Sequence, residues 1–177
     1  MEILRVLPPM VTPVALFVNA EPQRVRQVAV ELGIRTVQLH GDEPPESLAE
    51  LKNLTVIKAV RCDPKNLASV LETWREAAAR WNNLSALLLE TANTTAPGGS
   101  GVENDWAGIE AILKSQAALP PLIAAGGLTP ENVATVIKRL RPYAVDVSSG
   151  IEQSRGIKSV DKMRWFEAEV RNADDVA

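Results

Sequence analysis

The fold is decided by residues 121–150, which read PLIAAGGLTPENVATVIKRLRPYAVDVSSG. An apolar run over 122–125 predicts a short buried strand. Thr129 predicts the start of a helix, because a threonine oxygen can accept the first free amides and the proline that follows has no amide to lose. A second apolar run over 144–147 predicts another strand. The stretch is therefore interpreted as a strand–helix–strand unit, with glycine or serine after both strands.

The same alternation runs through the rest of the chain. Apolar runs alternate with segments whose apolar residues recur at helical spacing. These runs lack period-2 polarity, which indicates strands covered on both faces, as in a parallel sheet. We expect one domain over 1–177, an incomplete α/β barrel of about six βα units without a linker. The predicted strands are 11–18, 36–39, 56–60, 84–89, 122–125 and 144–147.

Composition limits the class of protein. Of the 177 residues, 46% are hydrophobic and 23% are charged, as in a domain with a substantial core. A net charge of −3 argues against a nucleic-acid partner, and no apolar segment is long enough to predict a membrane span. A single cysteine excludes an internal disulfide and a multi-cysteine metal site, which favours a reducing, cytoplasmic location.

Polar and small residues gather where the predicted strands end. In a parallel barrel all these ends lie on one face, so residues far apart in sequence converge on one mouth. This clustering is typical of an enzyme. The residues are Asn19, His40, Arg61, Glu90, Gly126, Gly127, Ser148, Ser149 and Gly150.

Two of these strand ends predict a phosphate site. Glycine lets a ligand approach backbone amides closely, and consecutive amides near a helix start attract an anion. The loops after the last two strands of a barrel are the usual place for such a site. We therefore expect Gly126, Gly127, Ser149 and Gly150 to bind phosphate. The alternative, that the glycines only turn the chain, stays open.

Motifs along nearly the whole chain resemble the phosphoribosylanthranilate isomerases of tryptophan biosynthesis. They keep the order found in that family, which makes the resemblance specific. The motifs are VALFVNA, VQLHGDE, VIKAVR, ALLLE, APGGSG, NDW, AAGGLTPENV and RPYAVDVSSGIE.

The resemblance implies a (β/α)8 barrel that catalyses an Amadori rearrangement of a small phosphosugar, N-(5-phosphoribosyl)anthranilate, without a metal or cofactor. Opening the ribose ring needs an acid at the ring oxygen, and forming the enol needs a base at the sugar C2. The family uses an aspartate as the acid where this chain has Glu90, one methylene longer. His40 and Asp146 match pocket positions of the family, and Arg61 ends its strand at the same mouth. We expect these three residues to bind substrate. Two alternatives stay open: a histidine satisfied by neighbouring loop backbone at His40, and a buried acid bonded to loop amides at Asp146.

The base of the family lies in a KICG motif, which this chain lacks. The resemblance begins at the helix after the second barrel strand, so we expect the first two strands to be missing. Six strands cannot close an eight-stranded barrel. Cys62 is an alternative base if Arg61 lowers its thiol pKa, although apolar packing is the ordinary fate of a free cysteine.

Three interpretations of function therefore stay open. The first is an isomerase that is complete only when the missing segment is supplied. The second is a catalytically incomplete remnant that retains a phosphate site. The third, a metal-dependent phosphosugar epimerase, is disfavoured because the chain has only one histidine. The glycine-rich segment 96–101 is predicted to be either a lid or a plain connection.

Overall fold

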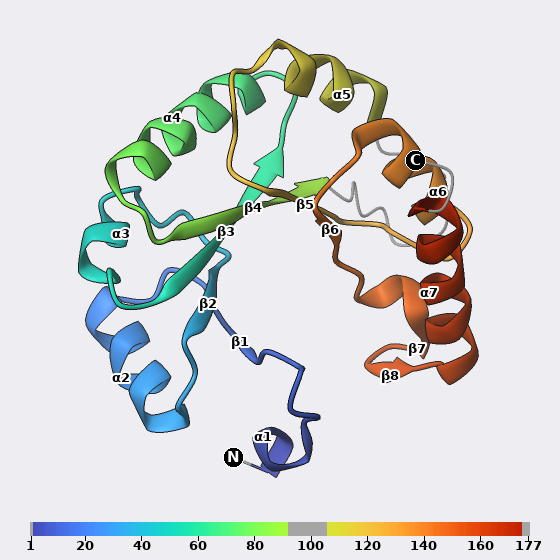
Figure 1. Ribbon diagram of the computed structural model, residues 1–177, viewed down its shortest axis with the longest axis horizontal. Coiled ribbons are helices and arrows are strands. Elements are labelled where there is room, and N and C mark those ends of the chain that lie inside the picture. Colours follow the sequence, from blue (N-terminus) through green and yellow to red (C-terminus); the bar gives the residue numbers. More distant parts are fainter. Residues whose placement is uncertain (1, 92–105, 175–177) are drawn as a thin grey trace.

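The computed structural model describes residues 2–91 and 106–174, so the predicted lid over 96–101 lies outside the described residues. Six parallel strands form one sheet in chain order (Figure 1). Each strand therefore pairs with the next strand along the sequence, as the alternating pattern predicts. The strands are β1 (Val14–Phe17), β2 (Thr36–Leu39), β3 (Thr55–Cys62), β4 (Leu84–Thr91), β5 (Leu122–Ala125) and β6 (Ala144–Val145).

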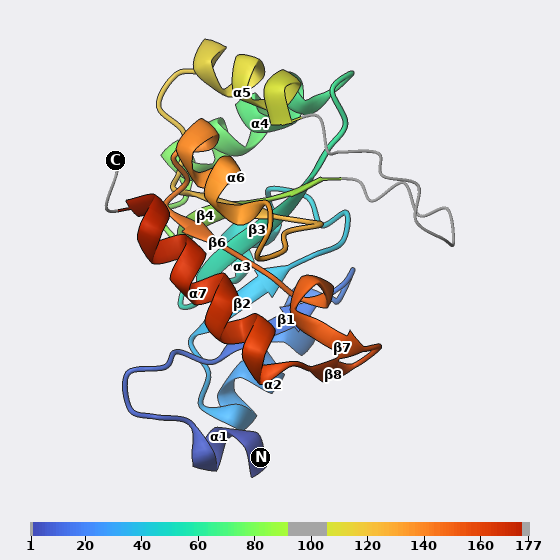
Figure 2. The same cartoon turned by 90° about the vertical axis from the view of Figure 1, so that its right-hand side faces the viewer.

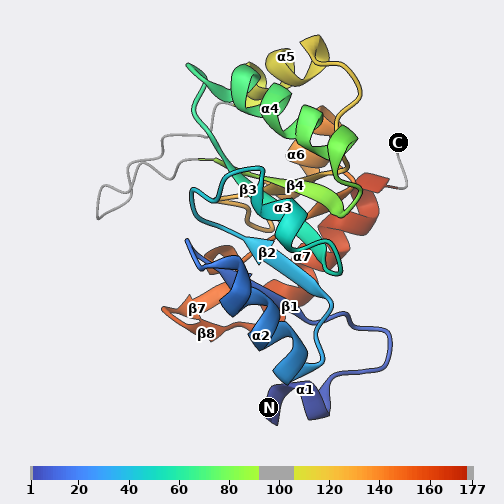
Figure 3. The ribbon, with the colours of Figure 1, turned by 90° about the vertical axis from the view of Figure 1, so that its left-hand side faces the viewer.

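Helices cover the outer face of this sheet. Figure 3 shows α2, α3 and α4 side by side along one flank of the molecule. The sheet is followed by η1 (Ser149–Ile151), the hairpin β7 (Glu152–Ser154) and β8 (Ile157–Lys158), and α7 (Val160–Asp174), which packs against α6 and η1 (Figure 2). The remaining helices are α1 (Glu2–Val6), α2 (Pro22–Leu32), α3 (Ser47–Glu50), α4 (Leu67–Arg80), α5 (Trp106–Ser115) and α6 (Val133–Leu140).

The two faces of the sheet carry different side chains. Because successive strand residues point to opposite faces, Val56, Val60 and Cys62 of β3 pack among the outer helices. Ala59 of the same strand meets Leu88 of β4 on the inner face, within a much smaller apolar cluster. The main core thus lies between the sheet and its helices. The inner face of the sheet is the side on which the strand-end residues of the mouth lie.

The sheet is open. Within the described part of the chain, β1 and β6 are the two ends of the sheet and do not pair, and the ribbon forms a horseshoe (Figure 1). The inner-face side chains Val14, Leu16 and Val18 at the β1 end are 44%, 57% and 59% exposed. The expected incomplete barrel of about six βα units is confirmed, and an apolar surface is left uncovered at its opening.

The predicted helix start at Thr129 is wrong. Helix α6 begins at Val133, with Asn132 at its N-cap. Asn132 instead binds the preceding loop: its Oδ1 accepts from the Thr129 amide at 2.9 Å, and its Nδ2 donates to the Gly127 carbonyl at 3.0 Å. Residues 130–132 form a turn in front of the helix: the Thr129 carbonyl accepts from the Asn132 and Val133 amides, and the Asn132 side chain fixes the turn to the preceding loop.

None of the helices within the two described ranges combines the length and apolarity that crossing a bilayer requires.

Candidate active site

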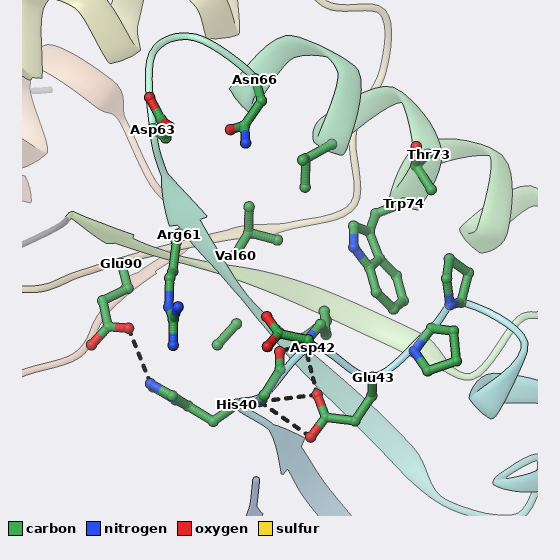
Figure 4. A pocket seen from close by; sticks show the side chains of 16 residues that line it. His40, Asp42, Glu43, Val60, Arg61, Asp63, Asn66, Thr73, Trp74 and Glu90 are labelled. Atoms are coloured by element: carbon green, nitrogen blue, oxygen red, sulfur yellow. Dashed lines mark hydrogen bonds and ion pairs between the residues drawn. The ribbon is translucent and has the colours of Figure 1, made fainter. Parts of the chain in front are cut away.

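The acid candidate lies at the mouth beside the only histidine of the chain. Val37 and Leu39 of β2 face the outer helices, so His40, the residue after β2, points to the inner side. Glu90 lies two residues after Leu88, an inner-face residue of β4, and therefore points to the same face. His40 Nε2 is 3.1 Å from Glu90 Oε2 (Figure 4), and the side chains are 26% and 37% exposed. Strands that are 50 residues apart in sequence thus place an imidazole against a carboxyl group.

A cavity of about 130 Å³ joins this pair to the predicted phosphate loops. It contains seven of the eight residues that the sequence predicts for the site, so the structure brings together strand ends that are far apart in the chain. These seven residues are His40, Glu90, Gly126, Gly127, Asp146, Ser149 and Gly150.

The eighth residue, Arg61, lines a neighbouring cavity of about 500 Å³. His40 and Glu90 line both cavities, which therefore meet at the histidine–glutamate pair. Figure 4 shows the Arg61 side chain beside Glu90 at this junction, with Trp74 on the far wall. The exposed guanidinium group faces a space large enough for an aromatic ring.

The two loops of the smaller cavity have backbones that need glycine. Gly126 and Gly127 have φ values of 81° and 66°, in the left-handed region that side chains disfavour. Gly150 packs so tightly that an added Cβ would lie 1.8 Å from the Leu128 carbonyl oxygen. These glycines therefore turn the chain and also bring the two loops together.

Asp146 is an exposed residue of the small cavity. Its side chain keeps contact with solvent, while the surrounding loops remove part of its water. This partial burial raises the pKa of Asp146, and the nearby His40 and Lys158 offset some of the rise. Repulsion from Glu90 acts in the same direction as burial. The cavity therefore disfavours a second negative charge beside Glu90.

A buried ion pair, which the sequence predictions missed, fixes the loop after β2. Lys58 Nζ lies 2.8 Å from Glu43 Oε2 and 2.5 Å from the Gly41 carbonyl, and the two charged side chains are 4% and 5% exposed. Glu43 also accepts from the Asn19 and Gly41 amides, at 2.8 Å and 3.0 Å for the closest oxygens. Burial alone would raise the pKa of Glu43, but these hydrogen bonds hold it below its ordinary value. A lysine inside the apolar run VIKAV is the signal that could have found the pair, since a buried charge needs a partner.

Gln38 was also missed. Its Nε2 lies 2.8 Å from His40 Nδ1, so the amide, the imidazole and the Glu90 carboxyl form one chain of contacts. The sequence feature that could have identified Gln38 is its position two residues before His40, because residues at i and i+2 along a strand share a face.

Cys62 does not reach the mouth. It is 6% exposed and packs in the outer core, one residue after the inward-facing Arg61. Burial, together with repulsion from Glu90, raises the pKa of the Cys62 thiol to about 12. The hypothesis that Cys62 is a base on the correct face is therefore wrong, and the packing interpretation is confirmed. In the described ranges, no group of three or more histidine, cysteine or acidic side chains is placed to hold a metal ion.

Comparisons with known proteins agree on one family. The family model described as N-(5'phosphoribosyl)anthranilate (PRA) isomerase matches residues 2–169. The N-(5'-phosphoribosyl)anthranilate isomerase of Nitrosococcus oceani is 39% identical over 176 residues, which are 99% of this chain and 78% of that protein. The isomerase of Pseudomonas fluorescens strain Pf0-1 is 42% identical over 171 residues, or 96% of this chain and 78% of its own.

Two similar solved structures are also phosphoribosyl anthranilate isomerases. Phosphoribosyl anthranilate isomerase from Thermotoga maritima superposes with a TM-score of 0.80 at 37% identity, covering 97% of this chain and 78% of that structure. An isomerase in complex with reduced 1-(o-carboxyphenylamino)-1-deoxyribulose 5-phosphate has a TM-score of 0.77 at 34% identity, over 97% of this chain and 77% of that one. The chain thus spans about three quarters of the length of these relatives.

Proposed function

The chain belongs to the N-(5'-phosphoribosyl)anthranilate isomerase family, and on that premise we propose that its mouth holds the acid and the phosphate site of such an isomerase. The observation that carries the proposal is the Glu90–His40 pair at the junction of two cavities. The smaller cavity has the glycine-rich loops that suit a phosphate group, and the larger one has room for an aromatic ring. The substrate is a phosphosugar joined to an aromatic acid, so its phosphate end matches the smaller cavity and its aromatic end matches the larger one.

Glu90 is the general acid in this proposal. It gives a proton to the ribose ring oxygen as the bond between that oxygen and C1 breaks and the anilino nitrogen forms a double bond to C1, which leaves a hydroxyl group, an iminium ion and a carboxylate. A base then removes the proton from C2, which gives an enolamine, and a proton added at C1 converts this enolamine into the aminoketone. Glu90 is one methylene longer than the aspartate of the family, and the contact with His40 Nε2 at 3.1 Å holds the longer arm in place.

The substrate is held from both sides. Backbone groups of the loops at Gly126, Gly127, Ser149 and Gly150 bind the phosphate, in the place where barrels commonly do so. Arg61 pairs with the carboxylate on the aromatic ring, because a guanidinium group binds carboxylates through two parallel hydrogen bonds. The reaction takes place in the cytoplasm, in one barrel domain to which the described part of the chain contributes the six-stranded parallel sheet.

The base comes from a segment outside residues 1–177. Cys62 cannot serve, since it is buried on the outer side with its thiol pKa raised to about 12. About a fifth of the length of the relatives lies outside the matched region, and the sheet of this chain is open between β1 and β6. A two-strand segment placed there covers the exposed Val14 and Leu16 and brings the family's cysteine to the mouth.

The test replaces Glu90 by glutamine in a protein extended at its N-terminus with the remaining segment of the Nitrosococcus oceani relative. We expect kcat to fall at least about a hundredfold, because a positioned general acid contributes that much or more. Glu167→Gln on α7 is the matched control, since this side chain is 61% exposed and far along the chain from the mouth. Unchanged turnover in Glu90→Gln refutes the acid assignment.

One observation favours a second candidate, a catalytically incomplete remnant that retains the phosphate site. The described chain places no thiol at the mouth, while the glycine-rich loops that we propose to bind phosphate line the small cavity. Phosphate binding together with inactivity of the folded, extended protein would support the remnant.

A further inference from the structure

Three side chains form a line across the mouth, from the inner face of β2 to the end of β4. Gln38 Nε2 is 2.8 Å from His40 Nδ1, and His40 Nε2 is 3.1 Å from Glu90 Oε2. Gln38 and His40 share the inner face because they are two residues apart and His40 directly follows strand β2. Figure 4 shows the imidazole extending toward the Glu90 carboxyl. The line thus ends on the acid proposed above.

The chemistry of these atoms fixes the direction of each hydrogen bond. An amide nitrogen can only donate, so Nδ1 of His40 must accept from Gln38. A neutral imidazole has one hydrogen, which then lies on Nε2 and is donated to Glu90. Gln38 therefore selects one of the two neutral forms of His40, the form that can donate to the acid.

We infer that Gln38 is a positioning residue for Glu90, acting through the tautomer of His40; this inference rests on the proposed role of Glu90 as the acid. Among the contacts of the described residues, the carboxyl group of Glu90 is held by its Oε2, so Oε1 is the oxygen that faces substrate with the proton. When Oε1 gives its proton to the ring oxygen, the carboxylate that remains accepts a stronger, charge-assisted bond from Nε2–H. His40 keeps its own proton throughout.

The other tautomer would work against the acid. With the hydrogen on Nδ1, Nε2 becomes an acceptor and competes with the substrate for the Glu90 proton. The lone pair of Nε2 would also face the carboxylate after proton transfer, which disfavours the product of that step. Gln38 thus keeps the proton directed at the substrate.

The tautomer can be measured directly because His40 is the only histidine of the 177 residues. Labelling the full chain with 15N-histidine gives a single imidazole in the NMR spectrum. At about pH 8.5, where an ordinary imidazole is neutral, we expect an unprotonated Nδ1 and a protonated Nε2. A hydrogen on Nδ1 in the unchanged chain would mean that Gln38 presents its oxygen, and would overturn the inference.

Two substitutions of Gln38 test its causal role. Gln38→Met removes the donor, so the nitrogen shifts should move toward an average of the two tautomers. Gln38→Glu offers only acceptors, so a hydrogen should appear on Nδ1. Gln23→Glu makes the same change on the exposed face of α2 and should leave the imidazole spectrum unchanged. If both Gln38 variants fold and keep the original spectrum, Gln38 does not set the tautomer.

Kinetics in the extended protein separate this inference from the proposed function. Gln38→Met should lower kcat about five- to tenfold, the effect of one hydrogen bond on the acid, and leave KM within about twofold. A changed tautomer with unchanged kcat would show that Gln38 does not serve the acid. A correct tautomer together with full activity of Glu90→Gln would instead show that the acid assignment has failed.

Discussion

Removing Lys58 should destabilise the protein far more than removing an exposed lysine. Lys58 Nζ binds Glu43 Oε2 at 2.8 Å and the Gly41 carbonyl at 2.5 Å, inside a pair whose side chains are 4% and 5% exposed. Lys58→Met leaves the Glu43 carboxylate buried without its partner. Breaking a buried pair in this way costs about 3–5 kcal/mol of unfolding free energy. An exposed pair contributes at most about 1 kcal/mol.

Urea denaturation of the 177-residue chain measures this difference. Lys114→Met is the matched control, because Lys114 pairs with Glu110 at 2.6 Å but its side chain is 73% exposed. The double variant Lys58→Met with Glu43→Gln should lose less stability than the two single variants added together, since it buries no unpaired charge. If Lys58→Met fails to fold, Glu43→Gln measures the pair from its other side.

The stability cost of Lys58→Met should depend on pH, and the lowered pKa of Glu43 gives the direction of that dependence. The pair holds the pKa of Glu43 below its ordinary value, so its contribution is present near neutral pH and is lost as pH falls through the lowered pKa. Without Lys58, the buried carboxyl can avoid its charge by taking up a proton. The cost of Lys58→Met should therefore be smaller at about pH 4 than at about pH 7. A cost no larger than that of Lys114→Met at neutral pH would refute the reasoning.

Three further predictions concern the mouth and the core. Gly150→Ala should lower the unfolding free energy by about 1–3 kcal/mol in urea melts, because its Cβ would lie 1.8 Å from the Leu128 carbonyl oxygen; unchanged stability would mean that the loops are not packed this way. Burial raises the pKa of Asp146, so the native state holds its proton more tightly and loses stability as pH rises through that pKa. Asp146→Asn should therefore raise the urea midpoint near pH 7 but not near pH 3, and an equal change at both values would contradict this. With its pKa raised to about 12, the Cys62 thiol should react with a disulfide reagent roughly a thousandfold more slowly in the native chain than in urea, and equal rates would place it at the surface.

Element positions could be predicted from the sequence wherever an apolar run has clear ends. The predictions for β2 and β5 agree with Thr36–Leu39 and Leu122–Ala125. Strand β4 continues to Thr91 instead of ending at 89, and β6 ends at Val145 instead of 147. At such places the extent of a strand depends on the partner strand, which the local sequence does not specify.

The sequence was enough to predict that the site residues meet at one mouth, but not which side chains contact one another there. Strand ends on one face of a parallel sheet predicted that His40, Glu90 and Gly150 would meet, and the small cavity contains all three. Whether a residue faces the mouth or the helices changes with a single step along the strand, and this step separates Arg61 from Cys62. Loop contacts such as those of Asn132 depend on tertiary packing and have no periodic signal.

The most direct measurement is isomerase turnover, followed by the loss of anthranilate-adduct fluorescence, for this chain alone and for the protein extended with the segment of its relative. The account predicts no turnover by the six-stranded chain, whose only thiol is buried, and turnover once two further strands supply the base. The residues proposed for the phosphate site and for the acid are the same in both proteins, so the comparison isolates the added segment. Equal turnover by the chain alone would contradict the account, because it would require a base among residues 1–177.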